Sequence, residues 1–111
     1  MTVRRTALAV GALVALALFA RVASQSAPAT RDGVFIHLTH GAEDPHRVAM
    51  ALQMARMMAA EKDVLVYCDI KAIGVVLKNS PDVKFAHFPS SKAQIAALSK
   101  LGVTIMACPG C

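Results

Sequence analysis

Short apolar runs alternate with helix-forming segments through most of the chain, and this alternation constrains the fold more than any other feature. GVFIHL (33–38), DVLVYC (63–68) and VTIMA (103–107) are bounded by turn residues and have the pattern of buried strands. The segments between them include HRVAMALQMARMMAAEK (46–62) and KAQIAALSKL (92–101), which are typical of helices. Strands and helices that alternate at this spacing form βαβ units. The sequence therefore predicts an α/β domain with a parallel sheet and helices on both faces.

Turn and capping residues support these boundaries. Asp44 fits an N-cap followed by a proline in the first helical turn, and Ser90 begins the last helix, which Gly102 closes. A middle stretch, IKAIGVVLKN (70–79), is predicted to be helical. The segment VKFAHF (83–88) fits either a short edge strand or an extended connection.

Residues 1–29 differ from the rest of the chain. Arg4 and Arg5 precede an apolar run of 15 residues (6–20), and Ala27-Pro28-Ala29 supplies a small-x-small cleavage pattern. The run is shorter than the roughly 20 residues that cross a bilayer as a helix. We therefore expect a bacterial export signal and a periplasmic or secreted domain over residues 30–111. Because Arg21 directly follows the run, an uncleaved N-terminal anchor is the alternative, and it would be the only membrane contact.

The charge of the chain comes partly from this targeting segment. It holds three of the 12 basic residues and none of the seven acidic ones, so the formal charge of the remainder is +2 rather than +5. The remaining basic residues are scattered singly, and Tyr67 is the one tyrosine. This pattern excludes a nucleic-acid-binding surface of clustered charge with stacking aromatic residues. A domain of about 82 residues has a small core, which favours a homo- or hetero-oligomer.

The last five residues, ACPGC, carry the strongest chemical signal. The chain has three cysteines, an odd number that an intramolecular disulfide framework does not explain. Two thiols separated by two residues can be a redox pair, half of a metal site, or a nucleophile with a helper. Ligands of parallel sheets bind beyond the carboxyl ends of the strands. We therefore expect the loops at 39–41, 68–69 and 108–111 to meet at one site.

Three segments of the sequence resemble a known family. GVFIHLTHGAEDPHRVAMALQMA (33–55), KNSPDVKFAHFPSSK (78–92) and especially LGVTIMACPGC (101–111) are similar to DsrE/DsrF-like proteins, the family of DsrE and TusD, and to its exported branch. The resemblance extends over residues 32–111. Its most specific element is a leucine-glycine turn, an apolar strand and a cysteine at the end of that strand.

The resemblance implies a three-layer α/β/α fold with a parallel sheet, and a cysteine that carries sulfur as a persulfide. Cys108 matches that cysteine, and Cys111, which is not part of the family pattern, is an auxiliary thiol. Because the relatives continue with another helix and strand, the chain resembles a C-terminally truncated member whose last helix and strand are missing. The implied function is sulfur handling with a protein sulfur donor or acceptor, without a cofactor. Whether the domain is an enzyme stays open.

Two other functions use the same residues. Cys108 and Cys111 form a CxxC motif, as in thiol-disulfide oxidoreductases. Together with His37 and His40 they also match the donor types of a Cys/His metal site. However, histidines three positions apart along a strand point to opposite faces, so we assign no metal. Of the two histidines, His40, in the loop, is the better candidate for a neighbour of Cys108, and a solvated loop histidine without a role at the site is the alternative.

The remaining sulfur-containing residues are given structural roles. Cys68 ends a predicted strand and is interpreted as a core thiol. Four methionines recur at helical spacing and could form a soft-metal stripe for copper, but we expect them to fill the core-facing side of their helix. They are Met50, Met54, Met57 and Met58. The first strand-helix loop lacks the GxGxxG spacing that nucleotide binding requires.

Overall fold

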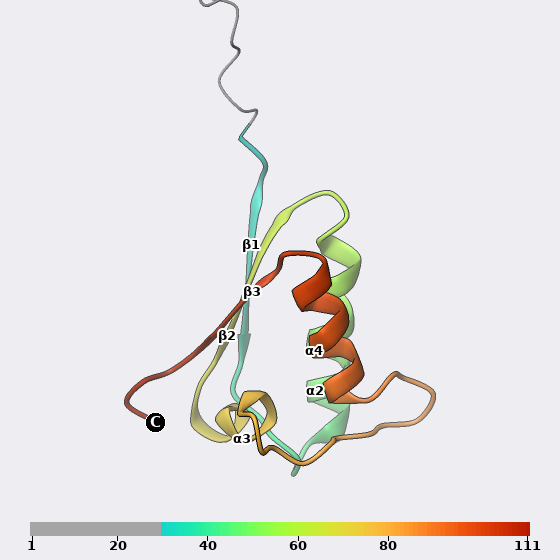
Figure 1. Ribbon diagram of the computed structural model, residues 1–111, viewed down its shortest axis with the longest axis vertical. Helices are drawn as coiled ribbons and strands as arrows, with labels where there is room; N and C mark the ends of the chain where they lie inside the picture. Colours follow the sequence, from blue (N-terminus) through green and yellow to red (C-terminus); the bar gives the residue numbers. More distant parts are fainter. Residues whose placement is uncertain (1–29) are drawn as a thin grey trace, which may run out of the picture. The chain divides into compact units, whose positions relative to one another are not determined.

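A computed structural model describes residues 30–111, so the predicted export signal lies outside the described residues. The elements follow the predicted order along the chain (Figure 1). They are β1 (Gly33–Leu38), α2 (Pro45–Met58), β2 (Asp63–Cys68), η1 (Ile70–Ala72), α3 (Ile73–Val76), α4 (Ser91–Lys100) and β3 (Thr104–Ala107).

The predicted α/β fold with a parallel sheet is confirmed. The three strands lie in the order β1-β2-β3, and both neighbouring pairs are parallel. β1 and β2 pair over their full lengths, with Leu38 opposite Cys68. β3 pairs with the last four residues of β2, so that Tyr67 lies opposite Met106 and Cys68 opposite Ala107. The carboxyl ends of all three strands therefore meet at one edge of the sheet.

Helices α2 and α4 lie side by side on the same face of the sheet (Figure 1). The strand order explains this arrangement, because both crossovers advance in the same direction across the sheet. Crossovers of the same hand that advance in the same direction place their helices on the same side. Residues 30–111 therefore form two layers around one core. The third layer is not formed by the described residues, and the α/β/α layering stays a prediction.

The core lies between the sheet and this helical layer. Alternate residues of β2 point into it, so that Val64, Val66 and Cys68 are buried while Leu65 and Tyr67 are partly exposed. From the helices, the buried apolar side chains are Val48, Ala49, Leu52, Ala55 and Leu98. The other side of the sheet, which we call the open face, carries Phe35, His37, Leu65, Tyr67, Thr104 and Met106. Phe35 is 61% exposed and Met106 is 48% exposed, although parallel sheets are usually covered on both faces.

The predicted helix starts are confirmed. The Asp44 carboxylate accepts a hydrogen bond from the Arg47 N–H at 3.1 Å, directly before Pro45. The Ser90 hydroxyl accepts from the Ala93 N–H at 3.5 Å, and Gly102 ends the last helical turn with φ of +74°. Both helices therefore use side-chain caps for N–H groups that have no partner within the helix.

Two predicted segments differ from expectation. The single helix expected over residues 70–79 divides into η1 and α3, and it ends at Val76. The segment 83–88 forms turns without a strand, which makes it the connection rather than the edge strand. Val83 anchors this connection, since its side chain is buried and its N–H donates to the Ser91 hydroxyl at 2.9 Å.

The prediction that the methionines fill the core is wrong for three of the four. Met50, Met54 and Met57 are 41%, 45% and 67% exposed, and only Met58 packs partly against the core. Helix α2 has a second apolar stripe on its opposite side, which includes Leu52. That stripe contains small residues, and they allow α2 and α4 to approach closely. Gln94 of α4, for example, reaches the Ala49 carbonyl at 3.4 Å.

Within residues 30–111, no helix combines the length and the apolar character needed to cross a membrane.

Candidate functional site

The end of β3 places Cys108 on the open face. The Cys108 N–H donates to the Cys68 carbonyl at 2.9 Å, which extends the β2–β3 ladder one residue beyond Ala107. Because side chains alternate along a strand, Cys108 shares its face with Met106 and, on the neighbouring strand, with Tyr67. Cys108 therefore lies at the carboxyl edge of the sheet, as the sequence predicts.

The neighbours of Cys108 favour its thiolate. The Cys111 thiol, the Gly110 N–H and the Tyr67 hydroxyl beside the Cys108 sulfur lower the pKa of Cys108, against the opposing effect of burial. The same contacts raise the pKa of Cys111, chiefly through its bond to Cys108, and the pKa of Tyr67, also chiefly through Cys108. The directions of these shifts make Cys108 the group of the three that ionises most readily relative to its ordinary pKa.

A hydrogen-bonded histidine and carboxylate lie next to Tyr67. His37 Nε2 lies 2.7 Å from Asp69 Oδ2, and the ring of His37 lies 5.7 Å from the ring of Tyr67. The Phe35 ring stacks on Tyr67 at 6.1 Å. The second carboxylate oxygen, Asp69 Oδ1, is buried and has no hydrogen-bond partner among the described residues. The site therefore combines a nucleophilic sulfur, a phenol and an imidazole-carboxylate pair at the end of an apolar surface.

Sequence reasoning did not find Tyr67 as a member of this group, and it considered His37 only as a possible metal ligand and Asp69 only as part of a neighbouring loop. The available signal was the alternation of residues along each strand, which places His37 with Phe35, and Tyr67 with Leu65. Using that signal requires the pairing register, which brings His37 opposite Tyr67 and Tyr67 opposite Met106. Register depends on how whole strands pack, and the spacing of residues within each strand does not reveal it.

The backbone of Ile70 supports the second thiol. Ile70 has φ of +51°, a left-handed conformation that a β-branched residue rarely adopts. The Ile70 N–H lowers the pKa of Cys111, although the larger effect of Cys108 raises it. The turn at the start of η1 thus holds the end of the chain near the carboxyl edge of β2, and the strain coincides with the candidate site.

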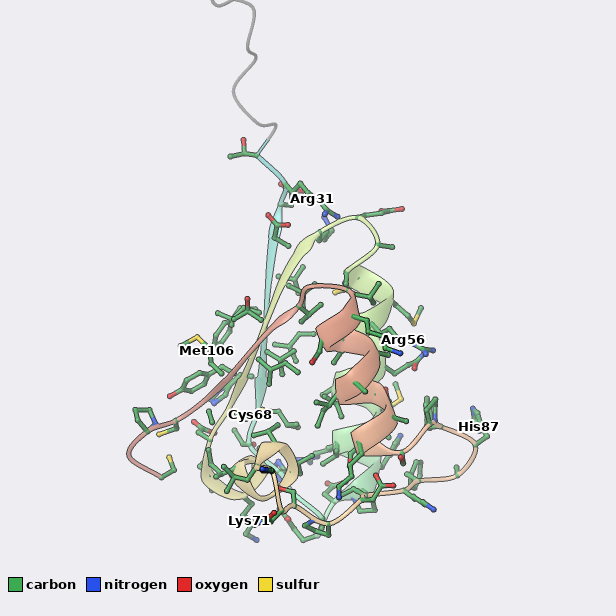
Figure 2. The ribbon with its side chains drawn as sticks, viewed as in Figure 1. Arg31, Arg56, Cys68, Lys71, His87 and Met106 are labelled. Atoms are coloured by element: carbon green, nitrogen blue, oxygen red, sulfur yellow. The ribbon has the colours of Figure 1, made fainter. Side chains whose placement is uncertain are left out.

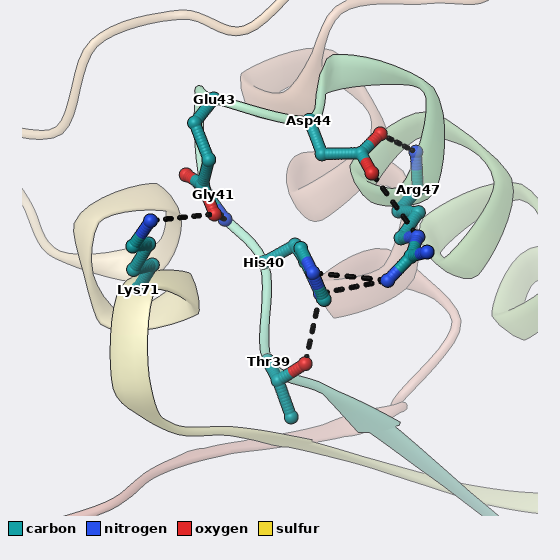
Figure 3. Close-up of polar contacts among 7 residues, drawn as sticks. All are labelled: Thr39, His40, Gly41, Glu43, Asp44, Arg47 and Lys71. Carbon is teal, nitrogen blue, oxygen red and sulfur yellow. Dashed lines mark hydrogen bonds and ion pairs between the residues drawn. The ribbon is translucent and has the colours of Figure 1, made fainter.

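His40 lies in a different group of polar residues (Figure 3). Its Nδ1 lies 2.9 Å from the Thr39 hydroxyl, and its Nε2 lies 2.9 Å from Arg47 Nη1. It borders a hollow lined by Thr39, His40, Glu43, Asp44, Ile70 and Lys71. The described contacts of His40 do not include Cys108. Its role at the thiol site therefore stays a prediction that these contacts do not support.

The loop that carries His40 is held by close backbone packing. The Gly41 N–H donates to both Glu43 carboxylate oxygens at 3.1 and 3.0 Å, and Lys71 Nζ lies 3.9 Å from Glu43 Oε1 (Figure 3). Burial raises the pKa of Glu43, but the hydrogen bonds from the Gly41 and Glu43 N–H groups and the charge of Lys71 outweigh it and lower the pKa. A Cβ on Gly41 would lie 2.5 Å from the Lys71 carbonyl oxygen, so this contact requires glycine.

Cys68 is a core thiol, as the sequence predicts. Its side chain is fully buried, and burial, with a smaller contribution from Asp69, raises its pKa to about 11. A neutral thiol without access to solvent does not react. The candidate chemistry therefore involves Cys108 and Cys111.

Residues 30–111 contain no group of three or more histidine, cysteine or acidic side chains placed to hold a metal ion. Although the terminal thiols are adjacent, His40 is engaged with Thr39 and Arg47. The arrangement in this part of the chain is a pair of thiols with a phenol donor, which suits sulfur chemistry better than a closed Cys/His site.

Comparisons with models of protein families, with curated proteins and with solved structures find no match to this chain.

Proposed function

We propose that the domain handles sulfur, with Cys108 as the residue that accepts a sulfane sulfur and carries it as a persulfide. The observation that carries this proposal is the position of Cys108 at the carboxyl edge of the sheet, where the Cys111 thiol, the Gly110 N–H and the Tyr67 hydroxyl lower its pKa. A thiol reacts as its thiolate, and these donors stabilise that form. The similarity of LGVTIMACPGC to DsrE/DsrF-like proteins supports the same assignment.

Sulfur acceptance balances without a cofactor. The Cys108 thiolate attacks the terminal sulfur of a donor persulfide, R–S–SH. The bond between the two donor sulfurs breaks, R–S⁻ leaves, and Cys108 becomes the persulfide Cys108–S–SH. Release follows when a thiolate of an acceptor protein attacks the outer sulfur and the Cys108 thiolate departs. The Cys108 sulfur is charged before acceptance and after release, and in both states the Tyr67 hydroxyl favours that charge.

Cys111 provides a second route of release. Its thiolate attacks the inner sulfur of Cys108–S–SH, forms the Cys108–Cys111 disulfide and expels HS⁻. A dithiol reductant then restores both thiols by becoming a disulfide itself. This route gives Cys111 a function in releasing sulfur from Cys108, although Cys111 is not part of the family pattern.

The remaining parts of the proposal concern the setting of the domain. Residues 1–29 support export to the periplasm, and the small core supports assembly with itself or with a sulfur donor or acceptor protein. The exposed open face is the surface that a third layer of an α/β/α fold would cover.

Thiol-disulfide exchange is the second candidate, and one specific observation favours it. The interaction between the two thiols lowers the pKa of Cys108 and raises the pKa of Cys111. In a CxxC pair the thiol with the lower pKa attacks and the other thiol resolves the mixed disulfide. In this case Cys108 attacks the disulfide of a substrate, and Cys111 then displaces the reduced substrate from the mixed disulfide.

Mass spectrometry after incubation with a small-molecule persulfide donor tests the first proposal. We expect an added sulfur on Cys108 in the parent protein, accumulation of that persulfide in Cys111→Ser, and none in Cys108→Ser. Cys68→Ala is the matched control, because that thiol is buried, and it should label as the parent does. Label on Cys111 that persists in Cys108→Ser would reject the assignment of Cys108.

An insulin reduction assay distinguishes the second candidate. Fast reduction that requires both cysteines, without persulfide on either one, would replace sulfur handling by thiol-disulfide exchange. If neither sulfur transfer nor disulfide reduction occurs, both proposals fail and Cys108 is a structural thiol.

A further inference from the structure

The outward face of α2 carries a stripe of exposed methionines. Met50, Met54 and Met57 follow one another at spacings of four and three residues, which places them on one side of a helix. The side chains that α2 buries, among them Leu52 and Ala55, lie on the opposite side. These methionines therefore do not belong to the core, and they need another explanation.

An ordinary solvent face does not account for them. Exposed helix faces are usually built from charged and polar residues. The α2 sequence PHRVAMALQMARMM contains neither lysine nor any acidic residue, and its charged residues are Arg47 and Arg56. Figure 2 shows the Arg56 side chain extending from the helical layer, away from the sheet. The stripe is thus a surface of thioethers at the positions where other helices carry charge.

The C-terminal half of the stripe converges on one hollow. Met54, Met57 and Met58 line it together with Glu61 and Lys62. Lys62 Nζ is paired with Asp32 Oδ2 at 3.2 Å, so its charge has a partner on another segment. Three methionines, whose side chains are flexible, therefore line the same hollow together with one acidic residue.

We propose that this hollow, lined by Met54, Met57 and Met58, is a binding site for a soft monovalent cation, Cu(I) or its analogue Ag(I). Thioethers are soft and uncharged ligands that select Cu(I) over Zn²⁺, Mg²⁺ and Ca²⁺. They do not take up protons near neutral pH, so binding needs no deprotonation, in contrast to thiol or histidine sites. The proposal does not depend on the function of the thiol site at the other end of the sheet.

Titration with Ag(I) in chloride-free buffer tests the site. The terminal thiols bind the same cations, so the experiment uses the full chain with Cys108→Ser and Cys111→Ser. Methionine methyl groups labelled with ¹³C report on each thioether separately. We expect one equivalent of Ag(I) to shift the resonances of Met54, Met57 and Met58, and anaerobic Cu(I) competing with a chromophoric chelator to occupy the same site.

Leucine variants separate metal binding from a purely apolar role, because leucine keeps the size of methionine and removes the sulfur. Met54→Leu with Met57→Leu should lower the affinity for Ag(I) by at least about tenfold, since even outer-shell partners of a metal contribute that much. Met106→Leu is the matched control, because Met106 is exposed to a similar extent on the open face of the sheet. Circular dichroism confirms the fold of each variant, and Met57→Leu alone is the milder substitute if the double variant fails to fold.

Three results would overturn the proposal. The first is the absence of Ag(I)-induced shifts in the methionine methyl groups. The second is shifts of Met106 as large as those of Met54 and Met57. The third is unchanged affinity in a folded Met57→Leu variant, which would leave the stripe as an apolar contact surface instead of a metal site.

Discussion

At the scale of single residues, the candidate site depends on where strand alternation places each side chain. Cys108 directly follows β3 and Tyr67 lies in β2, yet both are on the open face, and Tyr67 lowers the pKa of Cys108. Cys68, on the other face of the same strand as Tyr67, is buried with a pKa of about 11. Adjacent positions therefore have opposite chemical properties because successive residues of a strand point to opposite faces.

The first prediction concerns the pKa of Cys108. Cys111→Ala removes the largest of the contributions that lower it, so the pKa of Cys108 should rise, and Tyr67→Phe should raise it by a smaller amount. A higher pKa moves the onset of thiolate reactivity to higher pH. The measurement is the alkylation rate of Cys108 against pH, followed by mass spectrometry, with Phe35→Leu as the control on the same face. If the alkylation rate of Cys108 in Cys111→Ala depends on pH as it does in the parent protein, Cys111 does not stabilise the Cys108 thiolate.

The second prediction compares two glycines. Gly41→Ala places a Cβ 2.5 Å from the Lys71 carbonyl oxygen, so the backbone has to shift, at a cost of roughly 1–3 kcal/mol in the free energy of unfolding. A Cβ on Gly74, in α3, would meet no atom within 4 Å, so Gly74→Ala should stabilise by about 0.5–1 kcal/mol through helix propensity. Urea denaturation of both variants measures the difference. Equal free energies of unfolding for Gly41→Ala and Gly74→Ala would show that the close contact of Gly41 with the Lys71 carbonyl is absent in solution.

At the scale of elements, the two long helices begin with caps of different quality. Asp44 accepts from the Arg47 N–H at 3.1 Å and also pairs with the Arg47 guanidinium at 3.1 Å. The Ser90 cap of α4 is longer, at 3.5 Å. The packing of α4 depends more on Gln94, which is buried and donates to the Ala49 carbonyl of α2 at 3.4 Å. Local sequence signals thus start α2, while tertiary contacts hold α4.

The third prediction follows from this difference. Asp44→Ala should lower the free energy of unfolding by about 1 kcal/mol, the usual value of an N-cap, and Ser90→Ala by less. Asp44→Asn is the control, because asparagine keeps the cap and loses only an exposed ion pair, which contributes little. Thermal or urea unfolding gives the order of the three variants. A larger decrease of the free energy of unfolding in Ser90→Ala than in Asp44→Ala would show that the Ser90 cap is the stronger of the two.

At the scale of the whole molecule, the described chain has one core, on one side of a parallel sheet. Leu52 is fully buried between the sheet and the helices, whereas Phe35 on the open face is 61% exposed. Parallel sheets usually have both faces covered, so the open face is the surface at which an added layer or a partner would change the stability most.

The fourth prediction uses these two residues to test the layering. Leu52→Ala should cost about 2–5 kcal/mol in the free energy of unfolding, as buried leucines do. Phe35→Ala should cost less than about 0.5 kcal/mol if the face is open in solution. Denaturation at two protein concentrations measures both variants and separates coverage within the chain from coverage by a second copy. A cost of about 3–5 kcal/mol for Phe35→Ala would show that the open face is covered.

The sequence by itself determined the elements and the end of the strand at which Cys108 lies. Short apolar runs, an Asp-Pro helix start and a closing glycine are local signals, since each depends on the conformation of a few neighbouring residues. The sequence therefore predicted β1, α2, β2, α4 and β3 and the parallel arrangement of the sheet. Their order along the chain is enough to imply βαβ units.

Only the tertiary structure decided which faces are covered and which side chains meet. The strand order β1-β2-β3 placed both long helices on one face, and this left His37 exposed and Tyr67 partly exposed on the open face, where Cys108 also lies. Two apolar stripes of α2 competed for the core, and the stripe with small residues allowed the closer approach to α4, which turned Met54 and Met57 outward. Register and helix rotation depend on the packing of whole elements against each other, so the spacing of residues within one element does not determine them.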